Sequence, residues 1–305
     1  MRPLLLLLPV LFAACTLPAA PAVEDLSEPP LVTAKAWAIA DGRTGELLWG
    51  HNADEPRKAA STTKMMCAYV ILLRAEKEPA VLNERVTFSK LADETPGSTA
   101  DIKAGESLTV RDCLRGLLLP SGNDAGNALA EHFNARFAPP DAALLANGLD
   151  AAALATRVNF IAEMNRTARR IGLARTTYRS SYGDGGTEAD RTTTARDLTR
   201  VAWHAMQLPQ FREIVGTREY EGDVLQPDGR TRRARWENTN QLLGLDLGYD
   251  GVKTGTTTQA GQCLVARGRR GDDLLLVVVL GSATDARFVD TRNLFRWAWT
   301  KRATR

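Results

Sequence analysis

The sequence predicts an α+β fold, in which strands from both ends of the chain form one antiparallel sheet and a helical region is inserted between them. Strand-like segments occur before residue 51 and again after residue 216. Amphipathic helical patterns fill about residues 61–212, and another helical pattern ends the chain. With 305 residues, 44% of them hydrophobic, the chain can bury a large core against such a sheet.

The N-terminus has the pattern of an export signal. Arg2 precedes an apolar stretch over residues 4–14, which is too short to span a bilayer but typical of a secretory signal. We expect residues 1–22 to be a signal peptide and residues 23–30 to be a linker.

Two kinds of signal cleavage remain open. The A-P-A sequence at residues 20–22 is an ordinary cleavage site, whereas FAAC, which ends at Cys15, resembles a bacterial lipoprotein signal. The protein is therefore expected in the periplasm or cell envelope, either soluble or lipid-anchored through Cys15.

A single folded domain is expected over residues 31–305. Residues 34–50 predict a hairpin, because two apolar segments flank a turn that contains glycine. Helical patterns follow at residues 61–73, 109–119, 124–133, 149–172 and 192–206. Strands are predicted at residues 217–222, 248–257, 261–269 and 272–282, and a final helix at residues 285–300. The apolar run LLLVVVLG is too short to cross a membrane and is typical of a buried central strand.

Composition argues against several function classes. The formal net charge is only +3 and the charges are interspersed, so no nucleic-acid partner is expected. The sequence has no C-x-x-C pair with nearby histidines, so neither a metal nor another cofactor is predicted. Cys67, Cys113 and Cys263 are interpreted as small buried apolar residues, although a disulfide remains open. The three histidines are scattered, and no Ser-His-Asp triad is inferred.

Three short motifs carry candidate chemistry. In the first, STTK, Ser61 and Lys64 lie one helical turn apart, so the amine can reach the hydroxyl. On this motif alone, Ser61 is more often a helix cap than a nucleophile. In the second, Ser121-Gly122-Asn123 interrupts two apolar helical runs and presents a hydroxyl and an amide at a turn.

The third motif, KTGT, begins at Lys253 near the end of a predicted strand. It combines a cation with the hydroxyls of Thr254 and Thr256, and Gly255 permits close approach to the backbone. These groups suit an extended, carboxylate-bearing ligand that pairs with the strand edge. Each motif is a weak signal alone, but S-x-x-K, S-G-N and K-T-G in this order form a recognisable set.

With its surrounding sequence, this set closely resembles the D-alanyl-D-alanine carboxypeptidases, which are penicillin-binding serine peptidases. The resemblance extends from Trp37 to about Trp299. It implies a β-lactamase/transpeptidase-like fold and a D,D-peptidase catalytic domain over residues 31–305. It also implies hydrolysis of peptidoglycan stem peptides ending in D-Ala-D-Ala, no cofactor, and inhibition by β-lactam antibiotics.

The same resemblance implies catalytic roles. Ser61 would be the acylated nucleophile, and a neutral Lys64 would be its general base. Ser121 would relay a proton to the leaving D-alanine. The oxyanion hole would use the backbone N–H groups of Ser61 and Thr256.

Substrate-binding roles follow in the same way. Asn123 would hold the substrate backbone, and Lys253 would attract the terminal carboxylate. Thr254, Gly255 and Thr256 would complete the binding edge.

Two segments depart from the family pattern. Residues 176–186 replace the expected N-P-x-G-L run, and the connection around residues 135–155 is longer than usual. Both departures bear on substrate access and on the preference for carboxypeptidase or endopeptidase substrates.

Two alternatives from other functional classes remain. The first is a class A-like β-lactamase, although Glu188 and Asp190 do not form the E-x-x-L-N pattern of its deacylating base. The second is a non-catalytic protein of the envelope that binds peptidoglycan.

Overall fold

The structure is a computed structural model that describes residues 28–146, 149–152, 154–183, 193–245 and 248–303. The predictions for the signal peptide at residues 1–22, for Cys15 and for most of the linker lie outside the described residues. Within the described ranges, no helix is both long enough and apolar enough to span a bilayer.

A five-stranded antiparallel sheet joins the two ends of the chain, as predicted. Its strand order is β2-β1-β9-β8-β7. The strands are β1 (Ala36–Asp41), β2 (Leu47–His51), β7 (Tyr249–Thr257), β8 (Gly261–Arg270) and β9 (Asp273–Ser282). Strand β1 pairs with β9 along its whole length, from Ala36 opposite Leu280 to Asp41 opposite Leu275. Strand β7 is left at the edge of the sheet.

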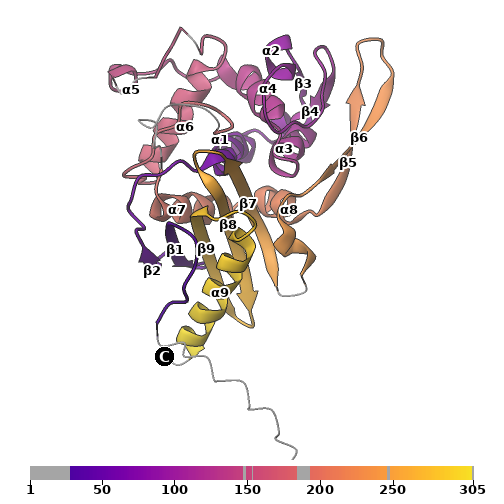
Figure 1. The fold of residues 1–305 in the computed structure, drawn as a ribbon. Coiled ribbons are helices and arrows are strands. Elements are labelled where there is room, and N and C mark those ends of the chain that lie inside the picture. The colour runs from indigo at the N-terminus through magenta and orange to yellow at the C-terminus, as the bar shows by residue number, and fades with distance from the viewer. Residues whose placement is uncertain (1–27, 147–148, 153, 184–192, 246–247, 304–305) are drawn as a thin grey trace, which may run out of the picture.

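Strand β9 is buried on both faces, which explains its unbroken apolar sequence. Leu275, Val277 and Val279 pack in one apolar cluster with α9 (Arg287–Ala303). Leu276 and Val278 point to the opposite face and join the larger core under the helical region. Figure 1 shows α9 lying across the sheet, with most of the other helices gathered above it.

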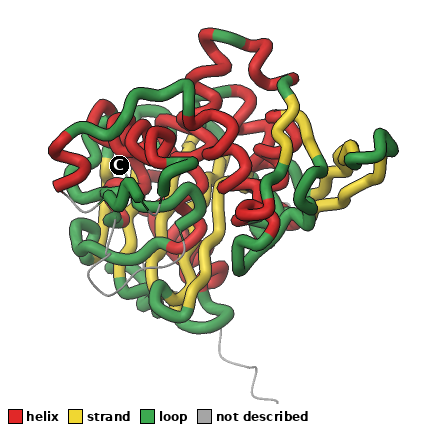
Figure 2. Tube along the Cα trace, turned by 90° about the horizontal axis from the view of Figure 1, so that it is seen from above, coloured by secondary structure: helices red, strands yellow, loops and turns green. Residues whose placement is uncertain are grey.

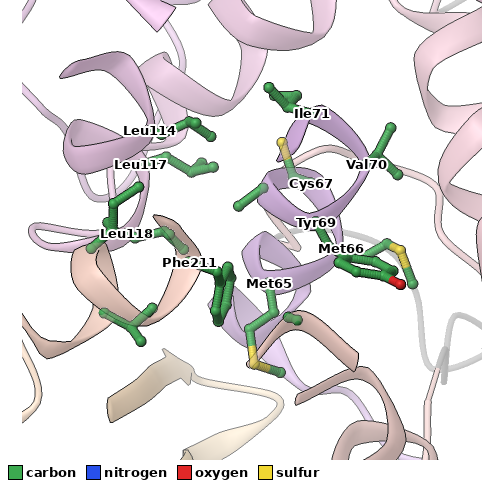
Figure 3. Close-up of a cluster of buried hydrophobic side chains, with 14 of the residues drawn as sticks. Met65, Met66, Cys67, Tyr69, Val70, Ile71, Leu114, Leu117, Leu118 and Phe211 are labelled. Carbon is green, nitrogen blue, oxygen red and sulfur yellow. The ribbon is translucent and has the colours of Figure 1, made fainter. Parts of the chain in front are cut away.

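The helical region is built around α1 (Lys64–Lys77). Its buried side chains include Met65, Met66, Cys67 and Ile71, which face several neighbouring elements, as Figure 3 shows. A helix that is apolar on most sides is typical of the centre of a domain. It packs against η1 (Ala60–Thr63), η2 (Pro79–Asn83), α3 (Val110–Leu118), α4 (Asn123–Asn134), α6 (Val158–Arg170), α7 (Ala195–Ala205) and α8 (Pro209–Gly216). The shorter elements α2 (Lys90–Asp93), α5 (Ala142–Ala146) and η3 (Gln241–Gly244) lie elsewhere.

Helix α7 begins as its sequence predicts. Thr194 is the N-cap, and its hydroxyl accepts a hydrogen bond from the Asp197 backbone N–H at 3.1 Å. In contrast, the helix predicted over residues 149–172 is wrong in its first part, since α6 begins only at Val158. The preceding alanine-rich segment supplies few large side chains to the core, and Leu149 and Leu154 pack in a small separate cluster.

A second antiparallel sheet was not predicted as such. It has the order β3-β4-β5-β6 and comprises β3 (Arg85–Thr87), β4 (Ser107–Thr109), β5 (Glu219–Leu225) and β6 (Thr231–Glu237). The sequence of β6, TRRARWE, reads as a block of charge, but Ala234 and Trp236 point inward and Arg233 pairs with Asp223 across the strands. Figure 2 shows this β5–β6 hairpin projecting from the body of the molecule.

Cys67, Cys113 and Cys263 are buried and free of disulfides, in agreement with their interpretation as apolar residues. Burial raises the pKa of the Cys67 thiol to about 12. These thiols are therefore protonated and unreactive in the folded protein.

Candidate active site

Ser61 lies in η1, immediately before α1. Its Oγ is 2.8 Å from Nζ of Lys64, and the two residues are only 5% and 0% exposed. Neither η1 nor α1 has a side-chain cap at its first turn, so Ser61 is not a helix cap here. Ala60, the preceding residue, has a positive φ of 47°, a conformation that is costly for a residue with a Cβ. This strained turn presents the Ser61 hydroxyl to the lysine.

Lys64 Nζ is held by groups from three parts of the chain. Besides Ser61, it donates to Oδ1 of Asn123 at 2.6 Å and to the carbonyl oxygen of Tyr182 at 3.1 Å. The Tyr182 ring centroid lies 5.9 Å from the same nitrogen. The amine is therefore fixed beside the Ser61 hydroxyl rather than free to sample rotamers.

The S-G-N turn joins α3 to α4 and contributes to the same site. The Asn123 Oδ1 accepts the hydrogen bond from Lys64, and the Asn123 Nδ2 donates one to the Pro96 carbonyl at 2.7 Å. A Cβ on Gly122 would lie 2.8 Å from the Ala100 backbone nitrogen, so the turn has no room for a side chain there. Asn123 thus contacts Lys64 directly, and its predicted contact with substrate stays a prediction.

Ser121 has two unusual features for a turn residue. Its φ is +70°, which an L-residue rarely adopts. Its Oγ is buried and has no hydrogen-bond partner among the described residues. A buried, unpaired hydroxyl costs free energy unless a ligand or water satisfies it, so this oxygen is suited to a transient partner.

The edge strand β7 closes the other side of the site. A Cβ on Gly255 would come within 2.8 Å of the Ala59 carbonyl oxygen and 3.1 Å of the Ser61 backbone nitrogen. The strand can therefore lie against Ser61 only because residue 255 is glycine. Thr254 Oγ1 is 2.6 Å from Thr239 Oγ1, and this contact orients one of the two motif hydroxyls.

Lys253 is 1% exposed, and its Nζ donates to the Thr254 carbonyl at 3.2 Å. Burial, together with the positive charges of Lys64 and Arg287, holds the pKa of Lys253 well below its usual range. Cations gathered in a buried site favour an anionic ligand, whose charge would offset their mutual repulsion.

Arg287 was missed in the sequence analysis. It is the first residue of α9, and its Nη1 donates to Oγ1 of Thr256 at 2.7 Å and to the Gly255 carbonyl at 3.2 Å. No local sequence pattern identifies Arg287, because 31 residues separate it from Thr256. The two residues meet only because α9 follows β9 and begins beside the end of β7. Tyr182 was also missed, although it lies in the segment that departs from the family pattern.

The structure thus brings together Ser61, Lys64 and Asn123 by direct contacts and lays β7 against Ser61. Glu188 and Asp190, which bear on the β-lactamase alternative, lie outside the described residues. No group of side chains suited to bind a metal ion occurs in the described ranges.

Comparison with known proteins identifies the family. A family model for D-alanyl-D-alanine carboxypeptidases matches residues 23–135 and 143–284. The chain belongs to this family. It is accordingly a serine peptidase. The break in the match, at residues 136–142, lies inside the connection that the sequence analysis identified as longer than usual.

Individual relatives agree with this assignment. The D-alanyl-D-alanine carboxypeptidase of Streptomyces sp. (strain K15) is 34% identical over 279 residues, which cover 90% of this chain and 89% of the relative. DacC of Escherichia coli (strain K12) is 32% identical over 291 residues, covering 92% of this chain. The chain spans 65% of that protein and 58% of Bacillus subtilis (strain 168) DacF, both named D-alanyl-D-alanine carboxypeptidases.

Solved structures confirm the predicted fold. The crystal structure of the Streptomyces K15 DD-transpeptidase has a TM-score of 0.78 at 32% identity, covering 90% of this chain and 99% of that one. Penicillin-binding protein 5 from Haemophilus influenzae has a TM-score of 0.74 at 27% identity, covering 90% of this chain and 72% of that one.

Proposed function

We propose that this serine peptidase removes the terminal D-alanine from peptidoglycan stem peptides that end in D-Ala-D-Ala, through an acyl-Ser61 intermediate. The observation that carries the proposal is the 2.8 Å contact between Ser61 Oγ and Lys64 Nζ, beside an edge strand that carries the buried Lys253 and Thr254. Family membership supports the same reaction.

In the acylation step, a neutral Lys64 accepts the proton of Ser61 as Oγ bonds to the carbonyl carbon of the penultimate D-alanine. The backbone N–H groups of Ser61 and Thr256 stabilise the oxyanion. The C–N bond then breaks, and the leaving amine receives a proton relayed through Ser121. Water hydrolyses the ester and regenerates Ser61.

The terminal carboxylate of the substrate binds at β7. Lys253 supplies positive charge, while Thr254 and Thr256 supply hydroxyl donors. Arg287 contacts Thr256 and adds a second cation within reach of the same strand edge. Because β7 is an edge strand, the substrate backbone can pair with it as an added strand.

The choice of acceptor is a separate question. The Streptomyces K15 relatives are named both as a carboxypeptidase and as a transpeptidase. These reactions share the acyl-enzyme and differ in whether water or an amine accepts the acyl group. We favour water for this chain. Product analysis with and without an added amino acceptor distinguishes the two, and also reveals any endopeptidase activity on cross-linked peptides.

A fluorescent penicillin tests the assignment. The parent protein should be labelled covalently and should release D-alanine from a peptide ending in D-Ala-D-Ala, whereas Ser61→Ala should do neither. Labelling that persists in Ser61→Ala would exclude Ser61 as the nucleophile. Rapid multiple turnover of penicillin without D-alanine release would favour a β-lactamase, and peptide binding without either reaction would favour a non-catalytic binding protein.

We further propose that the protein is exported and that its N-terminus is either cleaved after Ala22 or tethered through a lipidated Cys15. A stable tether needs more than one acyl chain, since a single chain gives only marginal membrane binding. Mass spectrometry of the mature protein decides between the two, because an N-terminus at Val23 excludes the lipid.

A further inference from the structure

A cavity of about 490 Å³ lies beside Ser61, next to the part of β7 that is proposed to bind the terminal carboxylate. Ala59 and Thr63, which flank Ser61 in the chain, form part of its wall. Other parts come from residues 177–180 and 182–183, the start of α6 and residues 257–259 after β7. Lys253, Thr254 and Arg287 do not line it.

The direction of β7 indicates which part of a substrate meets this cavity. In the proposed pairing, the terminal carboxylate lies against Lys253, Thr254 and Thr256, and the next residue of β7, Thr257, lines the cavity. One residue of extended strand covers about 3.3 Å, so the cavity begins directly beyond the carboxylate site. A peptide paired along β7 therefore brings the residues on the N-terminal side of its scissile bond to the cavity.

Two of the described side chains that line the cavity have unmet hydrogen-bonding capacity. One of them, Arg157, is cationic. Nε of Arg157 is buried and has no hydrogen-bond partner among the described residues. The same holds for the hydroxyl of Tyr178, a residue that is only 4% exposed. Two separate donors that line one cavity without acceptors point to an absent acceptor group.

We propose that this cavity binds a free carboxylate carried by the donor peptide on the N-terminal side of the scissile bond, with Arg157 as its charged partner and Tyr178 as a second donor. A carboxylate accepts from a guanidinium and a phenol together, and charge-assisted hydrogen bonds of this kind are the stronger class. The inference rests on the proposed function. It predicts that the enzyme prefers donors with a free carboxylate to the same donors with that carboxylate amidated.

The experiment compares two synthetic peptides of the same sequence, both ending in D-Ala-D-Ala. They differ only in whether the side-chain carboxylate of the residue before that dipeptide is free or amidated. For the parent protein, kcat/KM for D-alanine release should favour the free acid by about tenfold, as expected for one charge-assisted interaction. In Arg157→Gln the ratio should fall close to one, and in Tyr178→Phe it should fall part of the way.

Matched controls separate recognition from folding. Arg292 is exposed on α9, on the far side of the sheet, so Arg292→Gln should keep the parent ratio. Arg157→Lys should restore part of the preference, because it returns the positive charge. Thermal unfolding and acylation by penicillin confirm that each variant is folded and has an intact nucleophile.

The outcomes are distinct. Equal rates for the two peptides in the parent overturn the inference and leave the proposed function standing. A preference that persists unchanged in both Arg157→Gln and Tyr178→Phe also overturns it. If Arg157→Gln does not fold, the ratio in Tyr178→Phe decides. Failure of the parent to release D-alanine from either peptide refutes the proposed function, and the inference falls with it.

Discussion

The start of α1 and the edge strand β7 each bury a lysine at the same site, but they treat it differently. Lys64 donates hydrogen bonds to Ser61, Asn123 and Tyr182, whereas the side-chain hydrogen bond recorded for Lys253 goes to the carbonyl of the next residue. The first arrangement fixes a nitrogen against a hydroxyl. The second leaves the charge of a buried lysine without a negative partner among its recorded contacts, and a ligand carboxylate would supply one. The comparison teaches that two equally buried lysines differ in their local contacts, and this difference matches the roles proposed for them, a base for Lys64 and a carboxylate-binding group for Lys253.

The largest expected effect comes from Lys64→Arg. The guanidinium keeps its proton at any accessible pH, so it cannot accept the proton of Ser61. The rate of acylation by a fluorescent penicillin should fall about 1,000-fold, within the range typical for loss of a general base. Acylation of a folded Lys64→Arg protein at close to the parent rate would show that Ser61 has another activator.

The next largest effect tests whether acylation requires the close packing of β7 against the start of α1. In Gly255→Ala, the added Cβ would lie 2.8 Å from the Ala59 carbonyl oxygen, so β7 must move away from Ser61. A displacement of about 1 Å at a reacting centre can cost about 100-fold in rate, and we expect a loss of this order in penicillin acylation.

Gly216→Ala is the matched control, because its Cβ would meet the nearest atom at an ordinary 3.5 Å. Its acylation rate should equal that of the parent. Parent-like acylation by Gly255→Ala would contradict the close packing of β7 against the nucleophile.

The smallest effect concerns the charge of Lys253. Below its lowered pKa this residue is an ammonium, which would attract the substrate carboxylate as proposed, and the attraction would be lost as the pH rises through that pKa. As the pH is raised, the KM of the parent for a D-Ala-D-Ala peptide should therefore begin to increase before about pH 10.4, the pH at which an ordinary lysine titrates.

Lys253→Arg sharpens the contrast with Lys64→Arg. Arginine supplies a cation in a different geometry, so KM should be about tenfold higher at neutral pH, equivalent to about 1.4 kcal/mol. Its alkaline rise should disappear, because the guanidinium does not deprotonate. Measuring KM from about pH 6 to about pH 10 checks both expectations, and an unchanged alkaline rise in Lys253→Arg would assign it to another group.

Much of the fold could be predicted because its signals are local. The apolar segments of β1 and β2, the apolar run of β9 and the Thr194 cap each occupy a few consecutive residues. The strand predicted at residues 217–222 corresponds to the first part of β5, but β6 was not predicted, because its charged residues concealed the two that point inward. The late start of α6 was not predicted either, because the alanine-rich segment before it resembles a helix.

The sequence by itself determined the family, the sheet built from both chain ends and the Ser61–Lys64 pair, whose three-residue spacing places them on one helical face. Only the tertiary structure decided what surrounds that pair. Asn123 reaches Lys64 across 59 residues, Tyr182 across 118, and Arg287 meets Thr256 from another element. Such contacts depend on how the layers pack, and so does the lowered pKa of Lys253, because burial arises from the whole fold rather than from neighbouring residues.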